Sequence, residues 1–311
     1  MNKAQNPREI YGKTLLALAR ENRNIVALDA DLSKSTMSVY IENELPAQYV
    51  ECGIAEQNML GTAAGLALTG KIPFANTFAV FIAGRAYDQI RQSVSIAKLN
   101  VKIVGSCAGL SDFSDGATHQ MVEDIAIMRV IPNMTVICPS DANQVEAATR
   151  EIARYHGPVY MRIGRGDMCD ISEKGADFEI GKTYLKREGT QLTVFSCGIM
   201  TAMALEAAEQ LEGEQISVRV VDVPTVKPID RESIVSFCRD TKKVLCAEEH
   251  SIIGGLGSAV VEALRMERVE TDFLGIRDEF GQSSNDLDAL RQRYGLTVEE
   301  IKRKIREMIA S

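Results

Sequence analysis

The chain has 311 residues, a length that is comfortable for two domains. Its 45% hydrophobic and 25% charged content is that of an ordinary globular protein, and a net charge of −8 makes it a poor fit for a nucleic-acid partner. No apolar run approaches the roughly 18 residues of a spanning helix, and the polar N-terminus does not resemble a signal peptide. The seven cysteines include no CxxC pair, so we expect reduced core cysteines in a cytoplasmic protein; with three scattered histidines, a zinc site is not expected.

Short apolar strands alternate with helical segments along the first half of the chain, which predicts a mainly parallel sheet covered by helices. The first helix begins at Asn6-Pro7, a cap followed by a first-turn proline, and runs to about Arg20. A helix over 55–68, ended by Gly70, is rich in small apolar residues and is expected to be deeply buried. Strands are expected at 24–30, 49–53, 72–78, 101–107, 135–139 and 159–164, with further helices up to about 99 and over 142–156.

The alternation breaks at 165–190, a glycine-bearing, charged and aperiodic stretch that is typical of a linker. A second, smaller alternating unit follows, with strands expected at 192–198, 217–223, 243–249 and 269–276. We therefore expect an α/β fold with mainly parallel, helix-covered sheets in two domains, 1–168 and 191–311, joined by a linker over 169–190.

Glu56 lies in the segment Gly53-Ile54-Ala55-Glu56-Gln57, at a junction from strand to helix. A carboxylate in the first helical turn gains from the helix dipole, but a buried one still needs a polar partner. On these residues alone, a capping glutamate satisfied by backbone N–H groups is slightly favoured over a functional one. Phe78 and Phe81, three residues apart at a helix start, can form one flat aromatic wall, but on these residues alone ordinary core packing is clearly favoured.

The loop from Cys107 to Gln120 is too polar to be core, and it places Asp115 and His119 four residues apart. Loops that follow parallel strands are where α/β folds carry their sites, so a functional interpretation is favoured here.

Three arginines, Arg8, Arg162 and Arg165, lie near element ends and suit either phosphate binding or surface ion pairs. The segment Gly254–Gly257 looks like a phosphate-cradling turn, but Val260 occupies the position where a dinucleotide fingerprint needs Gly or Ala. A tight structural turn is the better interpretation of that segment.

Five motifs in this order resemble the transketolase family, namely its pyrimidine-binding domain followed by its C-terminal domain. The resemblance spans nearly the whole chain. The motifs are DADLSKS at 29–35, GIAEQ at 53–57, TFAVF at 77–81, DGATHQ at 115–120 and PNMTVICPSDANQVEAA at 132–148.

The resemblance implies an enzyme that uses thiamine diphosphate to move a two-carbon ketol unit from a ketose phosphate to an aldose. It implies catalytic roles for Glu56, as the partner of the aminopyrimidine N1′, and for His119, facing the reacting carbon. It further implies that Asp31, Phe78 and Phe81 contact the cofactor. The substrate residues implied are Arg8, Ser35, Cys107, Asp115, His119 and Arg165.

Two departures from the family pattern shape the expected function. The diphosphate-binding domain with its GDG…N metal motif is not in this sequence, so we expect a separate subunit to hold the diphosphate and Mg²⁺, with no metal ligand here and a heterotetramer as the working form. Cys107 stands where the family commonly has His, and Phe113-Ser114 where it has Gly-Glu. These changes put an ordinary pentose phosphate acceptor in question and point to a modified sugar.

Two other functions remain open at this stage. The β-subunit of a 2-oxo acid dehydrogenase E1 component shares the architecture, although the pattern of Asp115 and His119 argues against it. A non-catalytic subunit that only stabilises a partner is the second.

Overall fold

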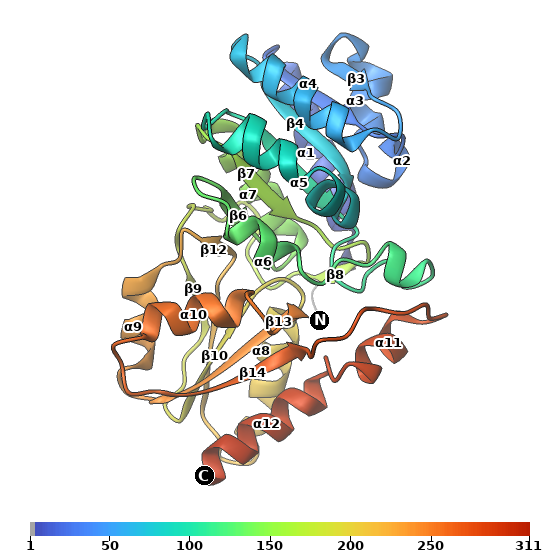
Figure 1. Ribbon diagram of the computed structural model, residues 1–311. Coiled ribbons are helices and arrows are strands. Elements are labelled where there is room, and N and C mark those ends of the chain that lie inside the picture. The colour runs from blue at the N-terminus through green and yellow to red at the C-terminus, as the bar shows by residue number, and fades with distance from the viewer. Residues whose placement is uncertain (1–3) are drawn as a thin grey trace.

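The computed structural model describes residues 4–311, which form two main sheets flanked by helices (Figure 1). The larger sheet has seven strands in the order β12-β6-β7-β5-β4-β2-β3. All of its pairings are parallel except that of β12 with β6. The strands are β2 (Ile25–Asp29), β3 (Tyr49–Glu51), β4 (Ile72–Phe78), β5 (Lys102–Ser106), β6 (Thr135–Ile137), β7 (Val159–Arg162) and β12 (Thr225–Lys227).

Alternate residues of the central strands face two separate cores, as period-two geometry requires. On β2, Ile25 and Ala27 pack with α1 and α7, whereas Val26 and Leu28 pack with α4. The helical segments are α1 (Pro7–Glu21), α2 (Ser33–Thr36), α3 (Val39–Glu44), η1 (Pro46–Gln48), α4 (Glu56–Leu68), η2 (Val80–Arg85), α5 (Tyr87–Gln89), η3 (Ile90–Ser95), η4 (Gly116–Thr118), α6 (Asp124–Arg129) and α7 (Ala142–Arg154). The Asn6 side chain caps α1 by accepting from the backbone N–H groups of Arg8 and Glu9, which confirms the predicted start.

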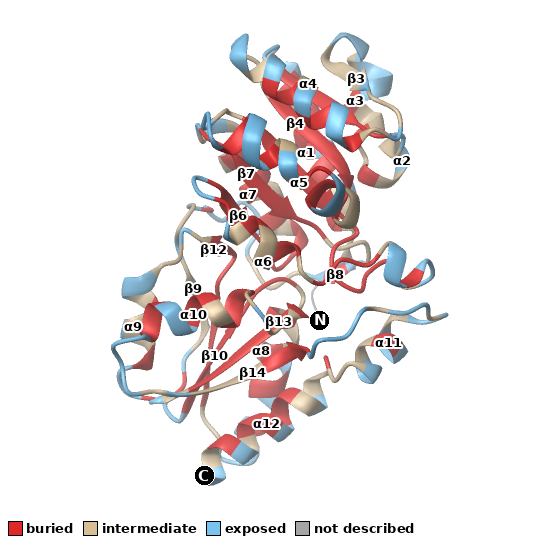
Figure 2. Cartoon of the chain, viewed as in Figure 1, coloured by how far each residue is buried: buried red, intermediate tan, exposed pale blue. Residues whose placement is uncertain are grey.

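The smaller sheet has the order β14-β13-β10-β11-β9, with β9 antiparallel to β11. Its strands are β9 (Tyr184–Arg187), β10 (Leu192–Ser196), β11 (Val218–Asp222), β13 (Lys243–Ser251) and β14 (Glu270–Ile276). Its helices are α8 (Met200–Glu212), α9 (Arg231–Cys238), α10 (Leu256–Leu264), α11 (Leu287–Arg293) and α12 (Val298–Ala310). Strands β10 and β11 are buried along their length, and Figure 2 shows that helix surfaces alternate between buried and exposed. Within residues 4–311, no helix is long and apolar enough to cross a membrane.

Two pairings cut across the domain division predicted from the sequence. Strand β12 comes from the second unit but joins the larger sheet, where Thr225 is in register with Ile137. The expected linker over 169–190 contains β9, and its first residue belongs to β8 (Met168–Cys169), which pairs with β1 (Ala4–Gln5). The boundaries at 168 and 191 remain a prediction, and the second unit is also joined to the first through β12, the strand it contributes to the larger sheet.

Helix α4 differs from the expectation of deep burial on all sides. Its buried residues are Glu56, Met59, Leu60, Ala63 and Ala64. The opposite face is open: Gly61 and Gly65 are exposed, and Leu68 is 74% exposed. The expectation was wrong for this face because the sheet covers only one side of the helix, so small apolar residues continue onto a surface that nothing in this chain covers.

Candidate active site

Glu56 is the first residue of α4 and is only 1% exposed. Both of its carboxylate oxygens accept hydrogen bonds from Nη1 of Arg85, at 2.9 and 2.8 Å. Arg85 ends the π-helical segment η2, and half of its side chain remains exposed. The partner that a buried carboxylate needs is thus supplied by a side chain 29 residues further along the chain, which the sequence did not reveal.

An aromatic cluster lies beside this ion pair. The rings of Phe78 and Phe81 are stacked, with centroids 5.9 Å apart and planes 11° from parallel. The imidazole of His119 stands edge-on to Phe81 at 5.4 Å and to Phe78 at 6.3 Å. The guanidinium of Arg85 lies over the Phe81 ring, 5.0 Å from its centroid. The structure therefore brings Glu56, His119 and both phenylalanines into one cluster linked by Arg85.

The second group of predicted residues gathers around Cys107, which follows β5 with a positive φ of 54° and is fully buried. Burial raises the pKa of the Cys107 thiol to about 12, with smaller opposing effects from Arg8 and Arg165. Nη1 of Arg8 donates to the carbonyl oxygen of Ser35 at 2.8 Å, so it is the backbone of Ser35 that holds this arginine. Nη1 of Arg165 donates to Asp112 at 2.5 Å.

Asp112 was missed by the sequence reasoning, although it lies in the predicted loop. Its side chain is fully buried, and Oδ2 has no hydrogen-bond partner among residues 4–311. Asp115 is exposed just before η4, and it is close enough to Cys107 to influence the thiol electrostatically. The two acidic side chains thus differ sharply in environment.

Asp31 lies two residues after β2, in a left-handed conformation with φ of 61°. Its side chain is exposed, and its backbone N–H donates to Oε1 of Glu51 at 2.9 Å. The neighbouring Asp29 is buried and accepts hydrogen bonds from Thr36 and Ser38 at 2.7 and 2.8 Å. Burial raises the pKa of Asp29 to about 6. Asp29 stabilises the turn that presents Asp31.

Arg162 is not part of either group. It is buried, and its Nε donates to both oxygens of Asp124, at 3.1 and 2.9 Å. Its Nη2 donates to the carbonyl oxygen of Glu249 at 2.9 Å. Arg162 therefore ties the larger sheet to the end of β13, a structural role that neither the phosphate nor the surface interpretation anticipated.

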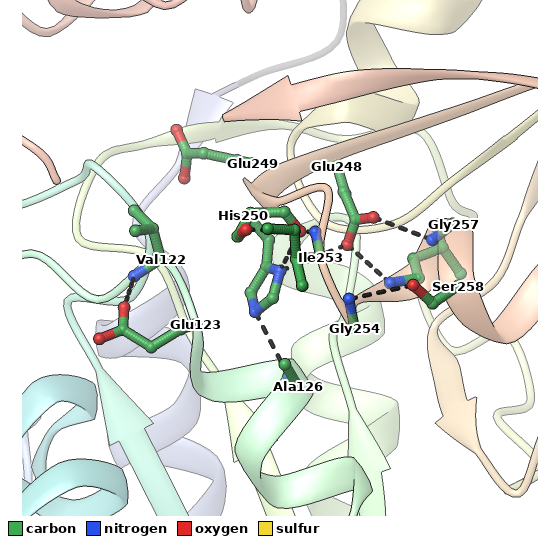
Figure 3. A network of polar contacts seen from close by, with 12 residues as sticks. Val122, Glu123, Ala126, Glu248, Glu249, His250, Ile253, Gly254, Gly257 and Ser258 are labelled. Atoms are coloured by element: carbon green, nitrogen blue, oxygen red, sulfur yellow. Dashed lines mark hydrogen bonds and ion pairs between the residues drawn. The ribbon is translucent and has the colours of Figure 1, made fainter. Parts of the chain in front are cut away.

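The end of β13 forms a polar contact between the two units (Figure 3). The backbone N–H of Ala126 donates to Nε2 of His250 at 3.4 Å, and that of Ser251 donates to the carbonyl oxygen of Val122 at 2.6 Å. The Glu248 carboxylate accepts from the backbone N–H groups of Leu256 and Gly257, at 2.6 and 2.9 Å. The glycine-rich turn at 254–257 thus already holds an anionic group of this chain, as a structural turn would.

The segment after β14 braces the loop that carries Asp115 and His119. The backbone N–H of Ser284 donates to the carbonyl oxygen of Phe113 at 2.8 Å, and Nε2 of Gln120 donates to that of Gln282 at 3.0 Å. A Cβ atom at Gly281 would lie 1.6 Å from Oε1 of Gln120, so a side chain there would force the Gln120 amide to move. The second unit therefore fixes the position of the site loop.

Two family models match the chain: "Transketolase, pyrimidine binding domain" over residues 3–170 and "Transketolase, C-terminal domain" over residues 181–301. The chain belongs to the transketolase family. This membership and the mainly parallel α/β fold confirm the expectations drawn from the sequence motifs.

Similar proteins cover the same part of a transketolase as this chain does. A protein of Methanocaldococcus jannaschii, provisionally named a transketolase C-terminal section, is 47% identical over 96% of this chain and 95% of its own length. A 6-deoxy-6-sulfo-D-fructose transketolase subunit SqwH of Clostridium sp. is 43% identical over 97% and 94%, respectively. A solved structure described as a split gene transketolase, inactive beta4 tetramer, matches with a TM-score of 0.91 and 47% identity, covering 98% of each chain.

Proposed function

We propose that this chain is the C-terminal subunit of a split, thiamine-diphosphate-dependent transketolase, a transferase that moves a two-carbon ketol unit from a ketose phosphate to an aldose, with a modified sugar as one substrate. A separate N-terminal subunit would bind the diphosphate and Mg²⁺, and the two would work as a cytoplasmic heterotetramer. The relative described as an inactive β4 tetramer supports the need for a partner. The relatives named as transketolase subunits favour this reaction over that of a 2-oxo acid dehydrogenase.

The observation that carries the proposal is a buried carboxylate beside stacked aromatic rings. The 1% exposed Glu56 and the Phe78–Phe81 pair suit the aminopyrimidine of thiamine diphosphate, which offers a ring nitrogen for a carboxylate and a flat face for stacking. When bound, thiamine diphosphate would supply a nucleophilic C2 carbanion and a thiazolium ring that serves as an electron sink.

Each residue of the chain then has a distinct role in the proposal. Glu56 would hold the proton on N1′, a role typically worth about 10²–10⁴-fold in rate. Phe78 and Phe81 would exclude water, and His119, edge-on to both rings, would move a proton at the substrate oxygen. Asp31 would lie near the thiazolium.

Substrate binding would fall to the residues around Cys107. Asp115, which is exposed, would accept a hydrogen bond from a sugar hydroxyl. Arg8, held by Ser35, and Arg165 would bind the terminal anionic group of the sugar.

The test is reconstitution with a diphosphate-binding subunit. The chain alone should be inactive and should bind thiamine diphosphate poorly, whereas the pair should transfer a ketol unit. Glu56→Gln should abolish exchange of the C2 proton measured by NMR without loss of fold, and Glu146→Gln on α7, a partly exposed glutamate, serves as the control. Full transfer by the chain alone would sink the split-enzyme proposal, and exchange at the wild-type rate in Glu56→Gln would refute the role of Glu56.

A further inference from the structure

In this structure, the Arg85 side chain makes both contacts that the proposed function, on which this inference rests, gives to the aminopyrimidine ring. Its Nη1 donates to the two carboxylate oxygens of Glu56 at 2.9 and 2.8 Å. Its guanidinium carbon lies over the Phe81 ring, 5.0 Å from the centroid. The guanidinium is a flat, nitrogen-bearing group, as an aminopyrimidine is. It therefore fills the space from which a ring could both reach Glu56 and lie against Phe81.

Two cationic groups cannot share the Glu56 carboxylate without repelling each other. Glu56 would act by favouring a proton on N1′, which places positive charge on the pyrimidine ring. A guanidinium on the same carboxylate offsets its negative charge and would lie beside the charged ring, where like charges disfavour each other. Arg85 therefore opposes the proposed role of Glu56 for as long as it stays in this position.

The Arg85 side chain is free to leave while its main chain stays in place. Nε2 of Gln57 on α4 donates to the carbonyl oxygen of Arg85 at 3.3 Å, and the next residue, Ala86, is fully buried. The Arg85 side chain is nevertheless 49% exposed, so rotation about its own torsions carries the guanidinium into solvent. Glu56, which is 1% exposed, has no comparable freedom. Arg85 is therefore the member of the pair that moves.

We propose that Arg85 occupies the aminopyrimidine position in the cofactor-free chain and moves out when thiamine diphosphate binds. Until then it keeps the buried carboxylate paired, and it competes with the cofactor for Glu56 and Phe81. Cofactor binding therefore breaks one half-exposed ion pair and one cation–π contact, each of which contributes modestly. Arg85 thus sets the affinity for the cofactor and is not a catalytic residue.

Calorimetric titration of the reconstituted complex with thiamine diphosphate, in the presence of Mg²⁺, tests this competition. Arg85→Met keeps the apolar stem and removes the guanidinium, so we expect it to lower the Kd of the cofactor about tenfold, which corresponds to about 1.4 kcal/mol. Arg91→Met, at an exposed arginine on η3, should leave the Kd unchanged. An unchanged or higher Kd in folded Arg85→Met, or an equal fall in both variants, would overturn the competition.

The wild-type complex provides a second measurement that does not depend on a variant folding. In its structure with thiamine diphosphate bound, Nη1 of Arg85 should lie beyond hydrogen-bond distance of both Glu56 oxygens, with the pyrimidine ring against Phe81. An intact Glu56–Arg85 pair beside the bound cofactor would overturn the displacement of Arg85 while leaving the cofactor site established. A complex that binds no thiamine diphosphate, whether wild-type or variant, would overturn the proposed function and the role of Arg85 with it.

Discussion

Replacing Arg85 with alanine tests how the chain accommodates a buried carboxylate in the first turn of α4. In the wild-type protein, both oxygens of Glu56 accept from the same Nη1 atom of Arg85. Without that guanidinium, Glu56 would remain buried among α4 and its neighbours with only the helix N-terminus to favour its charge. We expect Arg85→Ala to destabilise the larger sheet unit in the absence of cofactor.

The size of the effect follows from the unequal burial of the two partners. Removing one partner of a fully buried ion pair costs about 3–5 kcal/mol. Here the Arg85 side chain is 49% exposed, so solvent already screens the pair, while the helix dipole retains about 0.3–1 kcal/mol in favour of Glu56. We therefore expect a loss of about 1–2 kcal/mol in the free energy of unfolding.

Urea unfolding followed by circular dichroism would measure this in a double-mutant cycle with Glu56→Gln. In the Gln background, Arg85→Ala should cost less than about 0.5 kcal/mol, because no buried charge is left unpaired. Arg91→Ala, an exposed arginine on η3, is the matched control and should change little. A coupling energy near zero between Glu56 and Arg85 would refute the reasoning.

Three further variants probe other parts of the molecule. Burial raises the pKa of Asp222 to about 6, above its unfolded value near 3.9, so its favourable contribution is complete at low pH and lost as pH rises through 6. Relative to Asp222→Asn, the wild-type protein should therefore lose about 2–3 kcal/mol of unfolding free energy between pH 4 and pH 7; parallel pH curves would contradict this. Glu248→Gln removes the negative charge at the start of α10 and should lower the free energy of unfolding in urea by about 1–2 kcal/mol. The exposed Glu262→Gln should lower it by less than about 0.5 kcal/mol, and equal losses would count against a stabilising role for the Glu248 charge. Cys107→His should raise kcat/KM for phosphorylated aldoses several-fold in the reconstituted complex, since a cationic donor joins the two arginines; an unchanged ratio between acceptors would speak against it.

The sequence predicted those parts of the fold that depend on local chemistry. Asn6-Pro7 started α1 as expected, and the alternation of apolar strands with helices predicted both sheets. The return of β12 to the larger sheet was not visible, because strand pairing across 88 residues depends on the shape of the whole unit (Thr225 against Ile137). The sequence pattern predicted a helix over this region but could not show that η2 and η3 are π-helical.

The site shows the same division between local and distant information. Motifs located Glu56, Phe81 and His119, and the structure brings them together. No role was predicted for Arg85 or Asp112, because each acts through a partner 29 or 53 residues away that the sequence alone does not place beside it. The aromatic pair just before Arg85 was a usable signal, because a guanidinium close to aromatic rings is expected to lie over one of them.

The contacts between the segment at 281–284 and the loop at 112–120 have a consequence for engineering. The loop geometry depends on backbone carbonyls of Phe113 and Gln282 and on the absence of a side chain at Gly281. A loop transplanted from a relative without its matching segment would lose these hydrogen bonds and meet a surface shaped for another sequence. Under the proposed function, substrate range would therefore depend on two stretches far apart in the sequence, and chimeras should exchange both together.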